Sequence, residues 1–144
     1  MAIHITSTTK SCIVKPSTKD ELKAIIEQEL KRQGPDADLN FIDVSEIDNM
    51  ECLFYRKNIR NIEIDGWDVS NVRKMHGMFY DCKYLNCDLS GWNTSNVTFM
   101  SEMFYGCSEL KSDLSGWSDN SLIYAAGMFT FCDKMTDDLK PKFM

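Results

Sequence analysis

The chain has 144 residues, a hydrophobic share of 43% and a net charge of −6, which suits one folded domain and does not indicate disorder. An acidic chain lacks the basic stripe that nucleic-acid binding normally needs, and an anionic membrane surface repels it. No run of about 18 apolar residues occurs, so no membrane span is predicted. The N-terminus shows no basic stretch followed by an apolar run. We therefore expect a cytoplasmic protein, or a surface or secreted one if a signal peptide was removed, with no nucleic-acid or membrane partner.

Residues 1–35 are predicted to form an N-terminal arm and a capping helix. Two β-like runs, residues 2–6 and 12–15, fit a hairpin. Pro16 then ends the extended structure, because proline cannot donate to a strand ladder. The region before the repeats is therefore expected to combine a hairpin with a helix.

The helix is expected over residues 19–33. Thr18 and Glu21 have the spacing of a capping box, and Gly34 with Pro35 stops the helix. Its apolar stripe consists of Leu22, Ile25, Ile26 and Leu30. We interpret this amphipathic helix as the N-terminal cap of the repeats that follow; a partner-binding helix is the alternative.

Residues 36–139 repeat with a period of 25. The step of 25 joins the tryptophans Trp67, Trp92 and Trp117, the cysteines Cys82, Cys107 and Cys132, and the phenylalanines Phe54, Phe79, Phe104 and Phe129. The units are 36–60, 61–85, 86–110 and 111–135. A fifth unit starts and stops after Leu139, which leaves residues 140–144 as a tail. A fixed period in this range is typical of proteins whose units stack on their neighbours.

Within a unit the hydrophobic period changes. Cys87 and Leu89 alternate with polar neighbours, as in a short strand. Ser95 and Asn96 are good N-cap residues, and the apolar positions behind them are three to four apart, which predicts a helix of about two turns. The predicted fold class is therefore α/β: a short right-handed leucine-rich-repeat-like solenoid of about four 25-residue strand–helix units, with a helical N-terminal cap.

The pattern DLSGWNTSNVTFMSEMFYGCSEL resembles the BspA-like leucine-rich repeat, also called the DUF285 or mycoplasma-type lipoprotein repeat. The resemblance covers residues 36–139, and the segment before them resembles the leader of bacterial members. Members occur in bacterial surface proteins, lipoproteins and prophage-borne genes. The resemblance implies adhesion or protein binding rather than catalysis.

The cysteines and tryptophans that recur have structural interpretations. Cys82, Cys107 and Cys132 share one repeat position, which favours a buried ladder of free thiols over disulfides. The tryptophans are interpreted as a packed spine, with a stripe that stacks on carbohydrate or peptide as the alternative. Recurring aspartates are interpreted as a solvated edge rather than as calcium ligands.

No catalytic, cofactor or metal site is predicted. The chain has two histidines, His4 and His76, and its serines and aspartates are explained by turns and caps. A zinc site built on Cys82, Cys87 and Cys107 is disfavoured, because the repeat already accounts for two of these residues. We therefore expect a protein that is not an enzyme and carries no cofactor.

The predicted function is protein–protein recognition through positions that vary between units while the core does not. These candidate protein-binding residues are Asp68, Arg73, Asn93, Thr98, Ser118 and Ile123. One alternative is a self-assembling structural protein, most simply a homodimer through the C-terminal end, where Cys132, Met135 and Leu139 have no following unit to cover them. A surface adhesin fragment is the other.

Overall fold

The computed structural model describes residues 4–7 and 12–144; residues 1–3 and 8–11 of the predicted N-terminal arm lie outside them. Three regular elements occur in the order β1 (His4–Ser7), β2 (Cys12–Lys15) and α1 (Lys19–Gln33). The two strands pair antiparallel, with His4 opposite Lys15. The expected hairpin therefore forms in the described residues. Its first strand ends at Ser7, one residue beyond the predicted range of 2–6, and residues 2 and 3 of that prediction lie outside the described part.

Helix α1 has the bounds that its capping residues predict. The Thr18 Oγ1 accepts a hydrogen bond from the Glu21 N–H at 3.2 Å, which satisfies one of the free donors of the first turn. The Glu21 carboxylate in turn accepts a hydrogen bond from the N–H of Ser17 at 3.0 Å, one residue before the N-cap. Gly34 ends the helix with a φ of 86° and donates its N–H to the Leu30 carbonyl.

The predicted α/β solenoid of four strand–helix units is wrong. Among the described residues α1 is the one helix and β1 and β2 are the only strands, and all three precede the repeats. Cys87 and Leu89 lie outside any strand, and residues 97–106 contain one bridge residue and a run of turns in place of the expected helix. The repeats are a succession of turns joined by isolated parallel bridges between residues 25 apart.

The hydrogen bonds explain why the repeats form no helix. The N–H groups of Met100, Glu102, Phe104 and Gly106 donate to carbonyls 24 residues further along the chain, at 2.8 to 3.0 Å. The same positions in the two preceding units do likewise. The N–H groups between them close tight turns, as that of Met103 does on the Met100 carbonyl. Because an α-helix needs every N–H for a carbonyl four residues back, these donors are not available for one.

Two positions in each unit have left-handed backbone, which also interrupts a helix. The first set, 25 residues apart, is Cys52, Gly77, Glu102 and Gly127, and the second is Arg56, Asp81, Gly106 and Phe131. Each residue is the third of a turn closed by a hydrogen bond between its first and fourth residues. The turns therefore bend the chain at the same places in every unit, so that successive units stack in register.

Asparagine joins neighbouring units instead of capping helices. The Asn96 side chain donates to the Ser70 carbonyl at 2.6 Å, and Asn71 donates to the Ser45 carbonyl at 2.8 Å. The expected N-cap role of Ser95 and Asn96 is therefore wrong, because no helix follows them.

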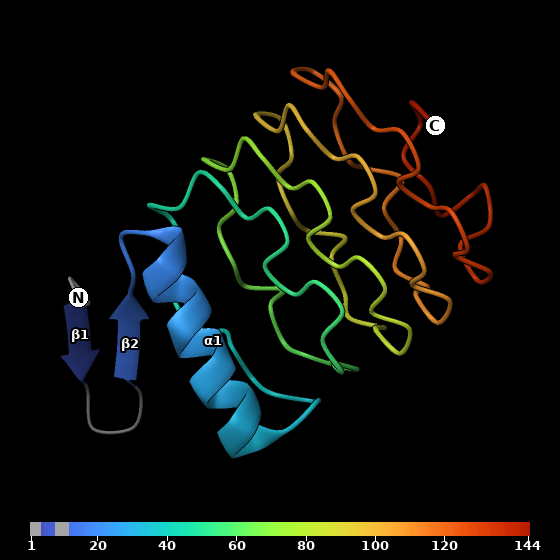
Figure 1. The fold of residues 1–144 in the computed structure, drawn as a ribbon. Helices are drawn as coiled ribbons and strands as arrows, with labels where there is room; N and C mark the ends of the chain where they lie inside the picture. Colours follow the sequence, from blue (N-terminus) through green and yellow to red (C-terminus); the bar gives the residue numbers. More distant parts are fainter. Residues whose placement is uncertain (1–3, 8–11) are drawn as a thin grey trace.

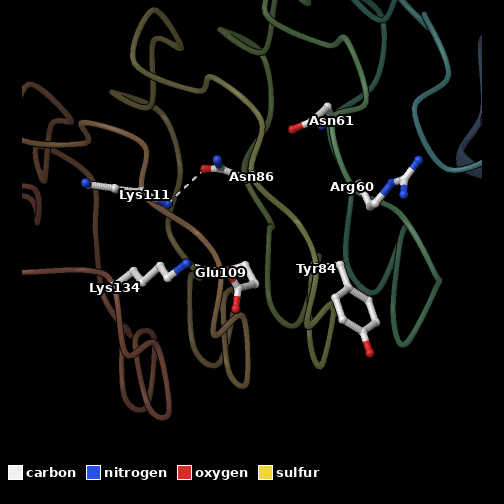
Figure 2. A pocket seen from close by; sticks show the side chains of 7 residues that line it. All are labelled: Arg60, Asn61, Tyr84, Asn86, Glu109, Lys111 and Lys134. Carbon is white, nitrogen blue, oxygen red and sulfur yellow. Dashed lines mark hydrogen bonds and ion pairs between the residues drawn. The ribbon is translucent and has the colours of Figure 1, made fainter.

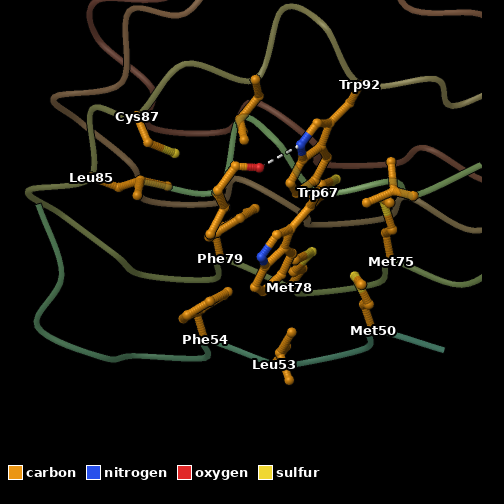
Figure 3. Packing of buried hydrophobic residues seen from close by; sticks show 14 of the residues in the cluster. Met50, Leu53, Phe54, Trp67, Met75, Met78, Phe79, Leu85, Cys87 and Trp92 are labelled. Carbon is orange, nitrogen blue, oxygen red and sulfur yellow. Dashed lines mark hydrogen bonds between the residues drawn. The ribbon is translucent and has the colours of Figure 1, made fainter. Parts of the chain in front are cut away.

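Aromatic side chains fill the interior of the stacked units. The rings of Phe54, Phe79 and Phe104 are fully buried and stack with centroids 5.3 and 5.5 Å apart. Beside them Trp67, Trp92 and Trp117 stack, with centroids 6.4 and 6.2 Å apart. The Trp92 Nε1–H donates to the Ile64 carbonyl at 3.0 Å (Figure 3). The predicted packed spine of tryptophans is confirmed, since each of the three rings is 4% exposed.

The recurring cysteines line this core as free thiols. Cys82, Cys107 and Cys132 are buried, and each Sγ–H donates to a phenylalanine carbonyl 28 residues earlier. Burial raises the pKa of Cys82 to about 12 and that of Cys132 to about 11. These thiols therefore stay protonated at neutral pH and act as small core side chains.

Different segments cover the two ends of the core. Helix α1 lies at one end, where Leu22 and Ile26 are fully buried, and the C-terminus lies at the other (Figure 1). The tail covers part of the second end: Pro141 is buried, Phe143 is half-buried against the core, and the Lys140 Nζ lies 5.9 Å from the centroid of the Phe129 ring.

Phe104 tests the packing of the core. Replacing Phe104 with alanine should lower the free energy of unfolding by about 3–5 kcal/mol, because the ring is fully buried between two neighbouring rings. Phe131→Ala is the matched control; this ring is 66% exposed, and its loss should cost less than about 0.5 kcal/mol. Equal effects of the two changes in urea unfolding would show that Phe104 is not in the core.

Two glycines test the left-handed turns. Gly106 has a φ of 75°, and a Cβ there would lie 3.0 Å from the Asp81 Oδ1, so Gly106→Ala should lower the free energy of unfolding by about 1–2 kcal/mol. Gly91→Ala should leave it unchanged or raise it by about 0.4–1 kcal/mol, because no atom lies within 4 Å of the added Cβ. Thermal and urea unfolding measure both changes, and a neutral Gly106→Ala contradicts the assigned turn.

Candidate interaction surface

Three of the six predicted protein-binding residues lie in one row that crosses the units. The Thr98 N–H donates to the Arg73 carbonyl at 2.7 Å, and the Ile123 N–H donates to the Thr98 carbonyl at 2.9 Å. The Thr98 hydroxyl also donates to the Arg73 carbonyl, at 2.9 Å. Hydrogen bonds between units therefore hold Arg73, Thr98 and Ile123 side by side on a regular backbone.

The other three predicted residues close turns in their own units. The Asp68 Oδ1, the Asn93 Oδ1 and the Ser118 Oγ each accept a hydrogen bond from the N–H two residues further along, at 3.0 to 3.1 Å. Their variation between units is explained by this shared role, since all three side chains offer an oxygen acceptor. No described contact brings them to the row of Arg73, Thr98 and Ile123.

A shallow hollow of about 340 Å³ adjoins that row. The side chains that line it come from the first to the fourth unit and are Glu51, Lys74, His76, Phe99, Ser101 and Tyr124. We call this hollow, together with Arg73, Thr98 and Ile123, the bridge face, because residues 49, 74, 99 and 124 form parallel bridges along it. Sequence reasoning missed the lining residues, although the 25-residue step places them one and three positions after the predicted row.

The side chains of the bridge face change from charged to aromatic along the stack of units. Its first units carry the opposite charges of Glu51 and Lys74, whereas its last units carry Phe99 and Tyr124. The rings of Phe99 and Tyr124 stack with centroids 5.5 Å apart and planes 10° from parallel. Tyr124 is 58% exposed and Ile123 is 64% exposed. The face thus offers a ring stack with an apolar neighbour at one end and polar and charged groups at the other.

A second hollow, of about 350 Å³, lies among charged and amide side chains and one tyrosine (Figure 2). It is lined by Arg60, Asn61, Tyr84, Asn86, Glu109, Lys111 and Lys134. Several of these groups bond to neighbouring units: Lys134 pairs with Glu109, and the Asn86 Oδ1 accepts from the Lys111 N–H at 3.1 Å. Arg60 pairs with Asp36, at the other end of its own unit. These contacts hold the repeats together, so the second hollow is explained by structure and is the weaker candidate.

Few potentially reactive side chains lie close together in the described part of the chain. His76 lies in the bridge face beside Glu51 and Ser101, but no hydrogen bond between these three side chains occurs in the described structure. In residues 4–7 and 12–144, no cluster of three or more histidine, cysteine, aspartate or glutamate residues is placed to hold a metal ion. The one helix in this part of the chain is too short and too polar to cross a bilayer.

One comparison with known proteins gives a match. The model of a family described as "Mycoplasma protein of unknown function, DUF285" matches residues 23–142, which include most of α1 and all the repeats. No curated protein and no solved structure matches the chain.

The aspartates of the turns predict how stability depends on pH. Hydrogen bonds from Ser70, Ser90 and Ser115 lower the carboxyl pKa values of Asp68, Asp88 and Asp113, respectively. Because the folded pKa is below the unfolded value, each carboxylate stabilises the fold above about pH 4, and this contribution is lost as the pH falls through the folded pKa.

Urea unfolding at pH 6 and pH 3 measures this dependence. The wild-type chain should lose stability on acidification, and the triple variant D68N/D88N/D113N should lose less. The asparagine side chains of the variant still offer an oxygen acceptor, as the Asn93 Oδ1 does in the wild-type chain, but they do not titrate between pH 3 and pH 6. An equal loss in both chains would assign the acid sensitivity to other groups.

Proposed function

Because this chain belongs to the DUF285 family, whose description assigns no function, we propose one from the surface of its repeats: a non-catalytic module that binds a protein partner through the bridge face. The observation that carries the proposal is the ring stack of Phe99 and Tyr124, which stands beside Ile123 on a regular backbone. Large apolar side chains grouped at a surface are typical of interaction sites, whereas single ones are ordinary.

The composition of the face supports a protein partner. Tyrosine contributes a large and rigid contact area together with a hydroxyl, and it is enriched among the residues that dominate binding energy. Glu51 and Lys74 lie beside the rings and offer one charge of each sign. Charges at the rim of an apolar contact favour one orientation of the partner over others.

The rigidity of the face supports the same function. Lys74 and Phe99 each form parallel bridges to both neighbouring units, through their own backbone groups on one side and those of the flanking residues on the other. Little order therefore has to be gained on binding. The resemblance of the repeat motif to BspA-like leucine-rich repeats, which are associated with protein binding, also favours recognition. That finer assignment rests on the sequence motif alone. The cytoplasmic location and the absence of catalysis stay predictions.

The two alternatives have less support. A surface adhesin would use the same face, and it stays a prediction because nothing in the fold bears on the cell surface. A two-fold homodimer through the C-terminal end also stays a prediction. The tail already buries Pro141 and half-buries Phe143 at that end, which reduces the apolar area left for a second copy.

A photo-crosslinking amino acid at position 74 tests the proposal in cells that make the protein naturally. Lys74 is exposed on the bridge face, and Tyr84, which is 60% exposed in the second hollow, is the control position. A covalent adduct with one protein is expected from position 74 and not from position 84.

Removing the rings should weaken the same contact. The double variant F99A/Y124A should lose at least about tenfold in affinity for the captured protein, which corresponds to about 1.4 kcal/mol, while Tyr84→Ala should keep its affinity. No adduct from position 74, or equal adducts from both positions, contradicts the proposed function.

A further inference from the structure

The bridge face is banded, because each unit contributes side chains of one chemical kind. The Arg73 N–H donates to the Asp48 carbonyl at 2.8 Å, and residues 49 and 74 form a parallel bridge, so the rows continue into the first unit. The four units give an acidic, a basic, a neutral and a largely apolar band, in that order, and none of the side chains is buried. The bands consist of Asp48, Asn49 and Glu51; Arg73, Lys74 and His76; Thr98, Phe99 and Ser101; and Ile123, Tyr124 and Ala126.

The two charged bands have no ionic partner of their own. In residues 4–7 and 12–144, no ion pair is formed by their four charged residues, Asp48, Glu51, Arg73 and Lys74. Exposed charges without an internal partner select the orientation of a bound molecule through opposite charges on its surface. Because the acidic and basic groups occupy separate units, the matching molecule must carry its cation and its anion one unit apart.

The length scale of the face matches an α-helix laid along the stack. Bridged neighbours lie about 4.8 Å apart and a helical turn advances about 5.4 Å, so successive turns stay within about 2 Å of successive units over the four bands. In an extended segment the side chains on one side repeat about every 6.7 Å, and the mismatch grows to about 6 Å over the same distance. Across the stack, residues 48–51 span about 10 Å, which is the width of one helix.

A two-fold pair of this chain does not match all the bands at once. A two-fold axis parallel to the stack sets each band against itself and so opposes like charges. An axis across the stack, between the first and second units, sets the acidic band of each copy against the basic band of the other. The rings of Phe99 and Tyr124 then lie beyond the first unit of the other copy, where no band faces them. A separate molecule is therefore the better match.

We propose that the bridge face binds an amphipathic helix of the partner protein, which lies along the stack in either chain direction. It carries a basic side chain over the first unit, an acidic one over the second and apolar ones over the fourth. Counted along the helix from the first unit, these side chains lie at i, i+3 and i+10 or i+11. An amphipathic helix laid on an apolar surface is a recurring mode of recognition, and here opposite charges set its register. The inference rests on the proposed function and names the form of the partner.

Designed peptides test the inference with the full-length chain. The matched peptide is an alanine-based helix of about 18 residues, with arginine at i, glutamate at i+3 and leucine at i+10 and i+11. The exchanged peptide swaps the arginine with the glutamate, so its composition and net charge are the same. NMR titration at low salt measures both affinities and locates the contact through the amide shifts of the four bands. The matched peptide should bind at least fivefold more tightly.

Exchanging the charged bands of the chain should reverse this preference. The variant D48R/E51K/R73D/K74E keeps the net charge and should bind the exchanged peptide at least fivefold more tightly than the matched one. A reversed preference shows that the variant is folded as well as that the charges set the register. F99A/Y124A should weaken the binding of both peptides. A matched peptide with proline at i+6 should bind at least tenfold more weakly, because proline breaks the helix.

Four outcomes overturn the inference: equal affinities of the two peptides, a preference that the exchanged bands do not reverse, full binding of the proline peptide, or self-association. Full binding of the proline peptide would indicate an extended segment. Shifts of the same amides that depend on the concentration of the chain alone, and that no peptide alters, would make the occupant a second copy.

Crosslinking from position 74 in cells is a separate readout. An adduct there without any preference between the peptides overturns this inference alone, because a protein then binds the face in another form. A reversible preference between the peptides without an adduct overturns the proposed function alone.

Discussion

The fold of the repeats depends on a backbone hydrogen bond that joins each unit to the next, 24 residues further along. A buried peptide N–H without an acceptor is costly, so a chain that abandons the helical pattern must satisfy its donors elsewhere. Here alternate donors go to the neighbouring unit and the others close turns. That division requires two left-handed residues in every unit, and it holds the phenylalanine and tryptophan rings in register. The core and the surface rows both follow from it.

The same constraint determines where binding can occur. In the first three units, alternate N–H groups all donate to carbonyls of the following unit. The units differ instead in the side chains at equivalent positions. Equivalent positions can therefore carry Lys74, Phe99 and Tyr124 without disturbing the backbone.

The period and the core were predictable from the sequence, but the path of the chain within a unit was not. Trp92 and Cys107 recur at fixed spacing and are buried as expected. Helix α1 was predictable because Thr18, Glu21 and Gly34 are local signals that need no partner. Val97, Met100, Met103 and Phe104 have helical spacing, yet their spacing reflects turns that present the same faces to the core. Local periodicity cannot distinguish these cases, because the deciding acceptors lie in another unit.

The candidate site was predictable in part for a similar reason. Variation between units identified Arg73, Thr98 and Ile123, which share a row. At a second repeat position it also selected Asp68 and Asn93, whose oxygens close turns.

Scalar couplings across hydrogen bonds test the ladder most directly, because they identify each acceptor. In a uniformly labelled sample, the amide nitrogen of Met100 should couple to the carbonyl carbon of Tyr124, and that of Phe104 to the carbonyl carbon of Met128. Couplings from these nitrogens to carbonyls four residues back would instead show a helix in each unit and contradict the stacked arrangement.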